Sequence, residues 1–211
     1  MAKQVTDDQL QTWLASSNWR IKNSAVKIIG ELKSDKFTDQ LKEFISDNTP
    51  ASFINRILGG DFINVGFVRR NSVITIRKIG ITDDSIKEVL LKALKDPYWE
   101  VRSESIITLK EFYADNCPND VIESIILCLQ DKKFEVVEQT AYAVGKLSNN
   151  ESGVNSLRVL YDHPNVLVKI AVVSALKSLH KRNIIKDKES LAEELSNIFI
   201  PGNHVNFINN I

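Results

Sequence analysis

Residues 96–109 read DPYWEVRSESIITL, a short turn followed by a segment with apolar residues at helical spacing. Val101 is an aliphatic anchor, and Ser105 is a small residue four positions later. Leu109 and Phe112 are apolar residues eight and eleven positions after the anchor. These offsets lie on one face of an α-helix, because the helix turns once in ~3.6 residues. The segment therefore predicts an amphipathic helix with a narrow buried stripe.

Four further segments follow the same pattern. Their anchors are Ile21, Val68, Val136 and Val168, and a basic residue follows the anchor in every copy except the one that begins at Val136. With Val101 in third place, successive anchors are 47, 33, 35 and 32 residues apart. This spacing is typical of stacked helical hairpins, in which each repeat buries its apolar face against its neighbours. The sequence therefore predicts a helical repeat protein.

Two of the repeated segments point to a known family. Residues 96–102 (DPYWEVR) and 163–169 (HPNVLVK) resemble the turn and second helix of HEAT repeats, especially the short type found in phycobilisome-lyase-like proteins. The resemblance covers roughly residues 7–199. It implies an all-α fold, namely an α-solenoid (superhelix) of about five HEAT-like helical hairpins plus a C-terminal capping helix. The family also implies interaction surfaces more often than catalysis.

We expect residues 1–211 to form a single HEAT-like solenoid domain with two irregular parts. The longest spacing between anchors places an insertion at residues 47–63, between the helices of the second hairpin, where the apolar residues suit a short helix before Gly59-Gly60. Residues 200–211 form an irregular tail after the last helix. That helix is either the terminal cap that a solenoid needs or the beginning of further repeats in a longer protein.

Composition excludes several classes of function. The 27 basic and 27 acidic residues leave no formal net charge, which argues against a dedicated nucleic-acid binder and against attraction to an anionic membrane. The three histidines, His163, His180 and His204, lack metal-ligand spacing. There is also no phosphate-binding loop or nucleophile elbow. We expect no cofactor, no metal and no enzymatic activity. With no signal peptide or membrane-spanning run in the sequence, we expect a cytoplasmic protein.

A row of residues on the second helices is the predicted partner-binding site. Positions six residues after the second, third and fourth anchors are apolar, and in HEAT-like arrays this row runs along the concave surface. Basic residues near the second anchor could attract an acidic peptide. The predicted site comprises Ile74, Ile107, Tyr142, Arg70, Arg77 and Lys78. The alternative is that the apolar residues only pack between helices and the charged ones only face solvent.

The favoured function is therefore a non-catalytic scaffold that binds a protein or peptide through the concave face. An acidic partner is one option, and the insertion is a second candidate surface. One rival is a nucleic-acid-binding protein of the alkylpurine DNA glycosylase type, although Glu104, Glu111 and Glu138 beside the same row would repel phosphate. A second rival is an interaction segment of a larger enzyme. Phycobilin lyases share the short repeats, but no chromophore-handling residue is identifiable here.

Overall fold

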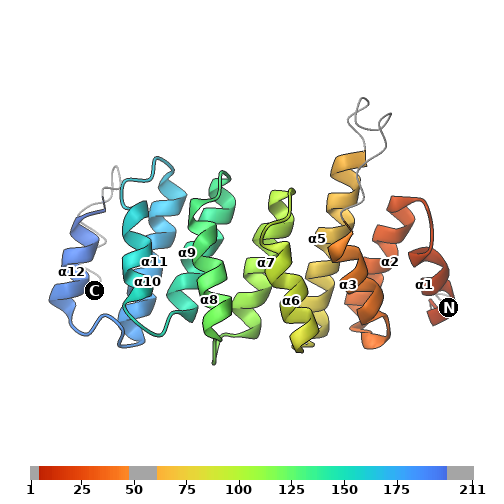
Figure 1. The fold of residues 1–211 in the computed structure, drawn as a ribbon, viewed down its shortest axis with the longest axis horizontal. Coiled ribbons are helices and arrows are strands. Elements are labelled where there is room, and N and C mark those ends of the chain that lie inside the picture. The colour runs from red at the N-terminus through yellow and green to blue at the C-terminus, as the bar shows by residue number, and fades with distance from the viewer. Residues whose placement is uncertain (1–4, 48–60, 199–211) are drawn as a thin grey trace. The chain divides into compact units, whose positions relative to one another are not determined.

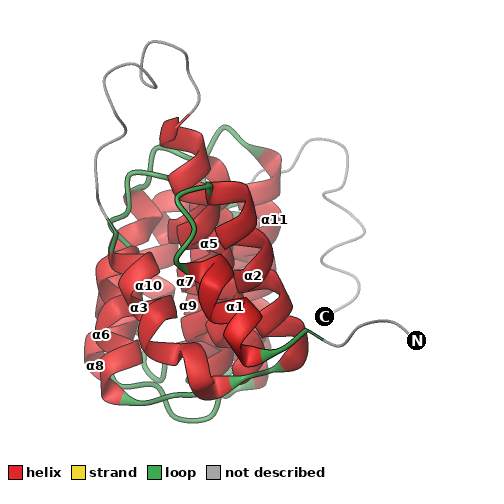
Figure 2. Ribbon diagram, turned by 90° about the vertical axis from the view of Figure 1, so that its right-hand side faces the viewer, coloured by secondary structure: helices red, strands yellow, loops and turns green. Residues whose placement is uncertain are grey.

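The computed structural model describes residues 5–47 and 61–198, and these residues form helices and loops with no strand (Figures 1 and 2). The predicted all-α class is confirmed. The chain divides into two compact units, Met1–Thr108 and Leu109–Ile211, and the boundary falls inside helix α7 (Trp99–Phe112). That the whole chain behaves as one continuous domain stays a prediction.

The first unit contains three helical hairpins, in which a shorter first helix is followed by a longer second helix. Its elements are α1 (Asp7–Leu14), α2 (Trp19–Leu32), η1 (Asp35–Phe37), α3 (Thr38–Ser46), α5 (Asp61–Ile79), α6 (Asp84–Ala93) and the greater part of α7. The second helices are therefore α2, α5 and α7.

The second unit continues the pattern with two further hairpins and a last helix. Its elements after α7 are α8 (Asn119–Ile126), η2 (Leu127–Gln130), α9 (Phe134–Leu147), α10 (Ser152–Leu157), η3 (Arg158–Leu160), α11 (Val166–Lys181) and α12 (Lys188–Ser196). The second helices are α9 and α11, so the described chain has the predicted five hairpins.

Side chains at the helix starts explain why the helices begin where they do. A capping box starts α1, because Gln9 N donates to Thr6 Oγ1 at 3.3 Å and Thr6 N donates to Gln9 Oε1 at 3.1 Å. Asn18 caps α2, accepting from Arg20 N at 3.0 Å. The Asp83 carboxylate caps α6, accepting from Ile86 N at 2.8 Å.

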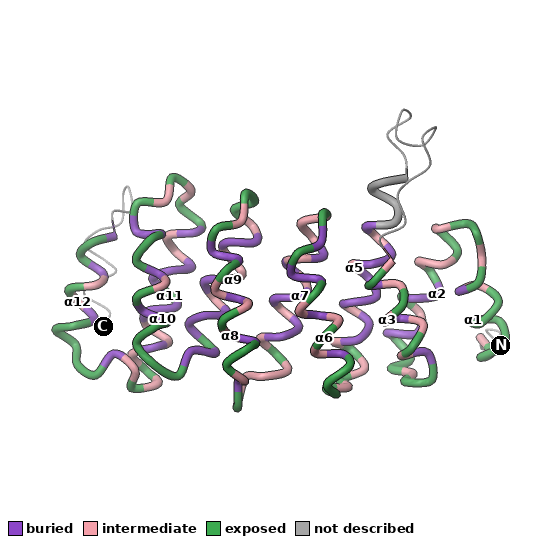
Figure 3. Tube along the Cα trace, in the orientation of Figure 1, coloured by how far each residue is buried: buried purple, intermediate pink, exposed green. Residues whose placement is uncertain are grey.

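Most of the repeated stripe is buried as the helical offsets predict, although Ile79 and Phe112 at offset eleven are only half-buried. Figure 3 shows buried and exposed positions mixed along the described parts of the helices. The positions four and eight residues after each anchor are at most 1% exposed in all five copies. These residues are Ala25, Ser72, Ser105, Thr140, Val172, Ile29, Ile76, Leu109, Val144 and Leu176. Because every copy places them against adjacent helices, they form the core that specifies the repeat.

The first copy departs from the prediction at both ends of its stripe. Ile21 is 42% exposed and Leu32 is 55% exposed, although the pattern predicts that both are buried. The length of α1 does not explain this, because α8 and α10 have 8 and 6 residues and the stripe ends of α9 and α11 are still at most 1% exposed. Helix α2 packs mainly against α1 and α5, and the exposure of Ile21 and Leu32 shows that neither helix covers the ends of its stripe.

The predicted insertion and tail fall largely outside the described residues. Helix α5 begins at Asp61, so residues 61–63, which we expected to belong to the insertion at 47–63, are helical. Residues 48–60 and the tail at 200–211 lie outside the described parts of the chain. The last predicted helix is present as α12, with Asp187 as its N-cap.

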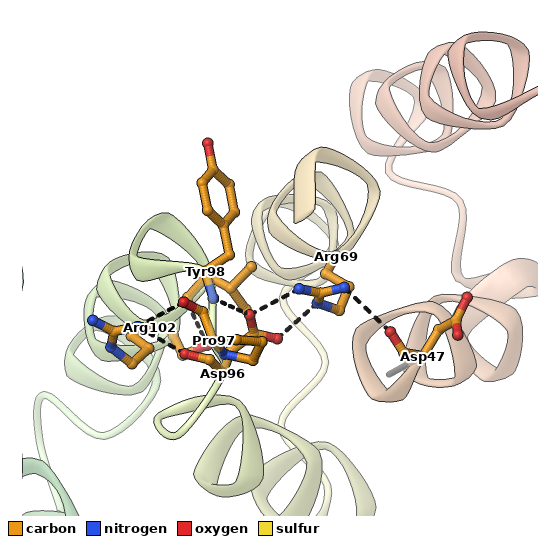
Figure 4. A network of polar contacts seen from close by, with 8 residues as sticks. Asp47, Arg69, Asp96, Pro97, Tyr98 and Arg102 are labelled. Carbon is orange, nitrogen blue, oxygen red and sulfur yellow. Dashed lines mark hydrogen bonds and ion pairs between the residues drawn. The ribbon is translucent and has the colours of Figure 1, made fainter. Parts of the chain in front are cut away.

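A buried polar network joins the second and third hairpins of the first unit (Figure 4). The Arg69 guanidinium donates to both oxygens of Asp96, from Nε at 2.7 Å and from Nη2 at 3.0 Å. Both side chains are at most 5% exposed. Asp96 also accepts from Tyr98 N at 2.7 Å, and Arg69 donates to the Asp47 carbonyl at 3.3 Å. Because every buried charge has a partner, the network fixes the turn before α7.

Candidate interaction surface

A groove in the second unit contains one of the predicted partner-binding residues. It has a volume of about 470 Å³, and its walls come from the end of α7, from α9 and from α11. The residues that line it are Lys110, Glu111, Ala114, Tyr142, Lys146, Ser174, Ala175 and Ser178. All of them lie on second helices or directly after one. The groove therefore lies along the second helices of the second unit and contains Tyr142 of the predicted row.

Small residues explain why this face is hollow. A β-carbon at Gly145 would lie 2.5 Å from the Ala175 Cα, so α9 and α11 approach closely enough to require glycine there. Ser178 Oγ donates to the Gly145 carbonyl at 2.9 Å and ties the two helices together. The lining residues on α11 are small, so they leave space beside the larger side chains of α9. The groove is thus a consequence of tight backbone packing with short side chains.

Tyr142 supplies the aromatic surface of the groove. Its side chain is half-buried on α9, six residues after the buried anchor Val136. Burial raises the pKa of the Tyr142 hydroxyl above its usual value, and the negative charge of Glu138 adds to this effect. Tyr142 is therefore neutral at physiological pH and presents both an apolar ring and a hydroxyl, a combination that is enriched at protein interfaces.

The other two apolar residues of the predicted site lie in the first unit. Ile74 is on α5 and Ile107 is on α7, and both are half-buried. They lie on adjacent second helices, which are bridged by the ion pair between Arg77 and Glu104 at 2.8 Å. Tyr142 belongs to the second unit. Partial exposure is compatible both with a binding row and with packing between helices.

All three predicted basic residues have acidic partners within the first unit. Arg70 pairs with Glu100 and stacks over the Phe67 ring, with its guanidinium carbon 5.0 Å from the ring centroid. Arg77 pairs with Glu104, as described above. Lys78 pairs with Glu31 on α2, with a distance of 2.5 Å between Nζ and Oε1. Since each cation is balanced by a neighbouring helix, these residues form a ladder of ion pairs along the array.

The sequence analysis missed most of the groove. Lys110 and Lys146 lie nine and ten residues after their anchors, at positions that match Arg77 and Lys78 of the first unit. Aligning the copies by their anchors would have found these two lysines. The groove could not be predicted from the sequence of any single repeat, because residues of three different helices line it.

The described residues contain no candidate metal site, and their two cysteines are buried. No group of three or more histidine, cysteine, aspartate or glutamate side chains in this part of the chain could hold a metal ion. Cys117 and Cys128 are buried and make no disulfide, and burial raises the pKa of Cys117 to about 11. A protonated thiol is a weak nucleophile at neutral pH. None of the described helices is long and apolar enough to cross a membrane.

Comparison with known proteins identifies the repeat. A family model of HEAT repeats matches residues 87–177, and no curated protein matches the chain. An engineered protein of known structure is 15% identical, with 92% of this chain and 99% of that chain aligned and a TM-score of 0.55. A second engineered protein is 16% identical, with 92% and 97% aligned and a TM-score of 0.50.

A third solved structure is that of the Pds5–Scc1 complex. One of its chains is 17% identical, with 90% of this chain aligned and a TM-score of 0.54. The aligned part covers 32% of that longer chain. At such identities the likeness shows the fold alone, and the repeat itself is shown by the family model. Residues 87–177 therefore match HEAT repeats, and the chain has the all-α fold of a helical repeat solenoid.

Proposed function

We propose that this chain is a non-catalytic scaffold that binds a partner protein through the face formed by its second helices. The observation that carries the proposal is the groove around Tyr142, which we call the Tyr142 groove. In the first unit, Ile74 and Ile107 would supply further apolar contacts. The volume of about 470 Å³ lies within the ~300–1,000 Å³ range of ligand-binding pockets.

Packing supports the idea that the surface is already ordered before it binds. The close approach of Gly145 to Ala175 and the hydrogen bond from Ser178 leave α9 and α11 little freedom to move. A preordered surface loses little conformational entropy on association, which otherwise costs about 0.5–1.5 kcal/mol for each immobilised side chain. A tyrosine in a hollow is also the kind of residue that dominates binding energy at interfaces. These features favour binding by rigid presentation of the surface.

The main effect of the basic residues Arg70, Arg77 and Lys78 would be on the rate at which an acidic partner associates. Each shares its charge with a glutamate in the free protein, so an incoming carboxylate has to compete with that glutamate. We expect these residues to affect orientation and association rate more than final affinity.

Quantitative affinity capture tests the proposal. The intact chain, Tyr142→Asp and Val159→Asp would be immobilised and exposed to cell lysate, and retained proteins would then be purified and their binding remeasured. Val159 is 72% exposed on η3, which follows a first helix, so it is a matched control for adding a carboxylate to the surface. We expect a partner that binds the intact chain and Val159→Asp but loses at least about tenfold in affinity, or 1.4 kcal/mol, on Tyr142→Asp. Equal binding to all three folded proteins would contradict the proposal.

A further inference from the structure

Lys146, a lysine of the Tyr142 groove, lacks the ion pair that the equivalent lysine of the first unit makes. Lys78 and Lys146 occupy the same position in their repeats, ten residues after the anchor. Lys78 pairs with Glu31, which lies at that position of the preceding second helix. Lys146 is exposed and pairs with no carboxylate among the residues that the structure describes. Its equivalent neighbour, Glu111, is engaged in another interaction.

The backbone position of Lys146 places its unpaired positive charge beside the groove. Lys146 follows Gly145, whose backbone is fixed against Ala175, so its Cα is held beside the groove. Glu138 lies one helical turn before Tyr142, and its charge is felt by the Tyr142 hydroxyl. On α9 itself, Glu138 therefore places a negative charge before Tyr142 and Lys146 places a positive charge after it. A ligand with one apolar group and one anionic group fits this arrangement in one orientation only.

We propose that the Tyr142 groove binds a short linear peptide in which an apolar side chain lies next to an acidic residue. The apolar side chain occupies the hollow between Tyr142 and Ala175, and the carboxylate pairs with Lys146. This inference rests on the proposed function and names the chemistry of its partner. It also differs from the predicted role of Arg70, Arg77 and Lys78, because it assigns recognition of the acid to the second unit.

A peptide library with matched variants tests the inference. A random-peptide library displayed on phage would be selected against the intact chain, and the affinity of the enriched peptides would be measured by fluorescence anisotropy. The variants are Tyr142→Ala, Lys146→Glu and Lys132→Glu. Lys132 is an exposed lysine in the turn before α9 and does not line the groove, so it controls for the change in net charge. Circular dichroism would confirm that each variant is folded.

The expected result is a set of peptides with an acidic residue adjacent to an apolar one. Lys146→Glu should weaken them about tenfold, because charge reversal replaces attraction by repulsion, while Lys132→Glu should change affinity less than about twofold. Enriched peptides that depend on Tyr142 but tolerate Lys146→Glu would overturn this inference and leave the proposed scaffold intact. Peptides that also bind Tyr142→Ala unchanged, or the absence of any enriched peptide, would overturn both.

Discussion

Loss of the Asp96 carboxylate should destabilise the first unit severely. Asp96→Ala removes two hydrogen bonds to Arg69, at 2.7 and 3.0 Å, and the acceptor for Tyr98 N at 2.7 Å. The Arg69 side chain is 5% exposed and would keep only the Asp47 carbonyl at 3.3 Å among the contacts described above. An uncompensated charge in such a site costs ~3–5 kcal/mol, so the free energy of unfolding should fall by about that amount.

A double variant separates the ion pair from simple loss of packing. Arg69→Met/Asp96→Ala removes the stranded charge as well as its partner, so it should be less destabilising than the sum of the two single variants by ~2 kcal/mol. Lys36→Ala is the control for an exposed pair, because Lys36 and Asp7 are 66% and 56% exposed. That change should cost less than ~1 kcal/mol.

Urea unfolding followed by tryptophan fluorescence measures these differences in the free energy of unfolding of the first unit. All three tryptophans of the chain, Trp13, Trp19 and Trp99, lie in the first unit, so their emission reports its unfolding, whereas far-ultraviolet circular dichroism reports both units. A cost below about 1 kcal/mol for Asp96→Ala, or strict additivity of Arg69→Met and Asp96→Ala, would refute the reasoning, because either result requires that the pair is solvated or uncoupled.

Three other changes have defined outcomes. Gly145→Ala places a methyl group against the Ala175 backbone and should lower the free energy of unfolding by ~1–3 kcal/mol, measured by urea unfolding. Asp83→Ala removes the cap of α6 and should cost ~0.5–2 kcal/mol in the same assay; no loss would contradict the capping role. The hydrogen bond from Arg158 lowers the pKa of Glu194 below 4.5, so the stabilisation is present above that value and is lost as the pH falls through the folded-state pKa. Glu194→Gln should therefore be less stable than the intact chain at neutral pH and equally stable in strong acid, and a gap that does not depend on pH would contradict this.

The core of the repeat could be predicted from the sequence because it depends on local geometry. Offsets of four and eight residues are set by the helical period, and those positions are buried in every copy. Burial of Ile21 and Leu32 could not be predicted in the same way. It depends on which elements pack against the ends of the helix, and in α2 neither α1 nor α5 covers them.

Those parts of the candidate site that lie at a fixed offset from the anchor residues could be predicted from the sequence. Tyr142 follows from its offset, and the pairing of Lys78 with Glu31 could have been anticipated because both lie at the same offset in adjacent second helices. The groove itself was not predictable. It depends on the close approach of Gly145 to Ala175 and on short side chains along α11, which are properties of three helices packed together.

The most direct test of the scaffold account is chemical-shift mapping by nuclear magnetic resonance of the labelled chain during titration with its tightest-binding library peptide. The account predicts saturable shifts of backbone amides on α9 and α11 around Tyr142, Lys146 and Ser178, which line the groove. Shifts confined to the first helices α8 and α10 would contradict it, because the peptide would then bind the opposite elements of the same hairpins. The absence of saturable shifts would contradict it equally.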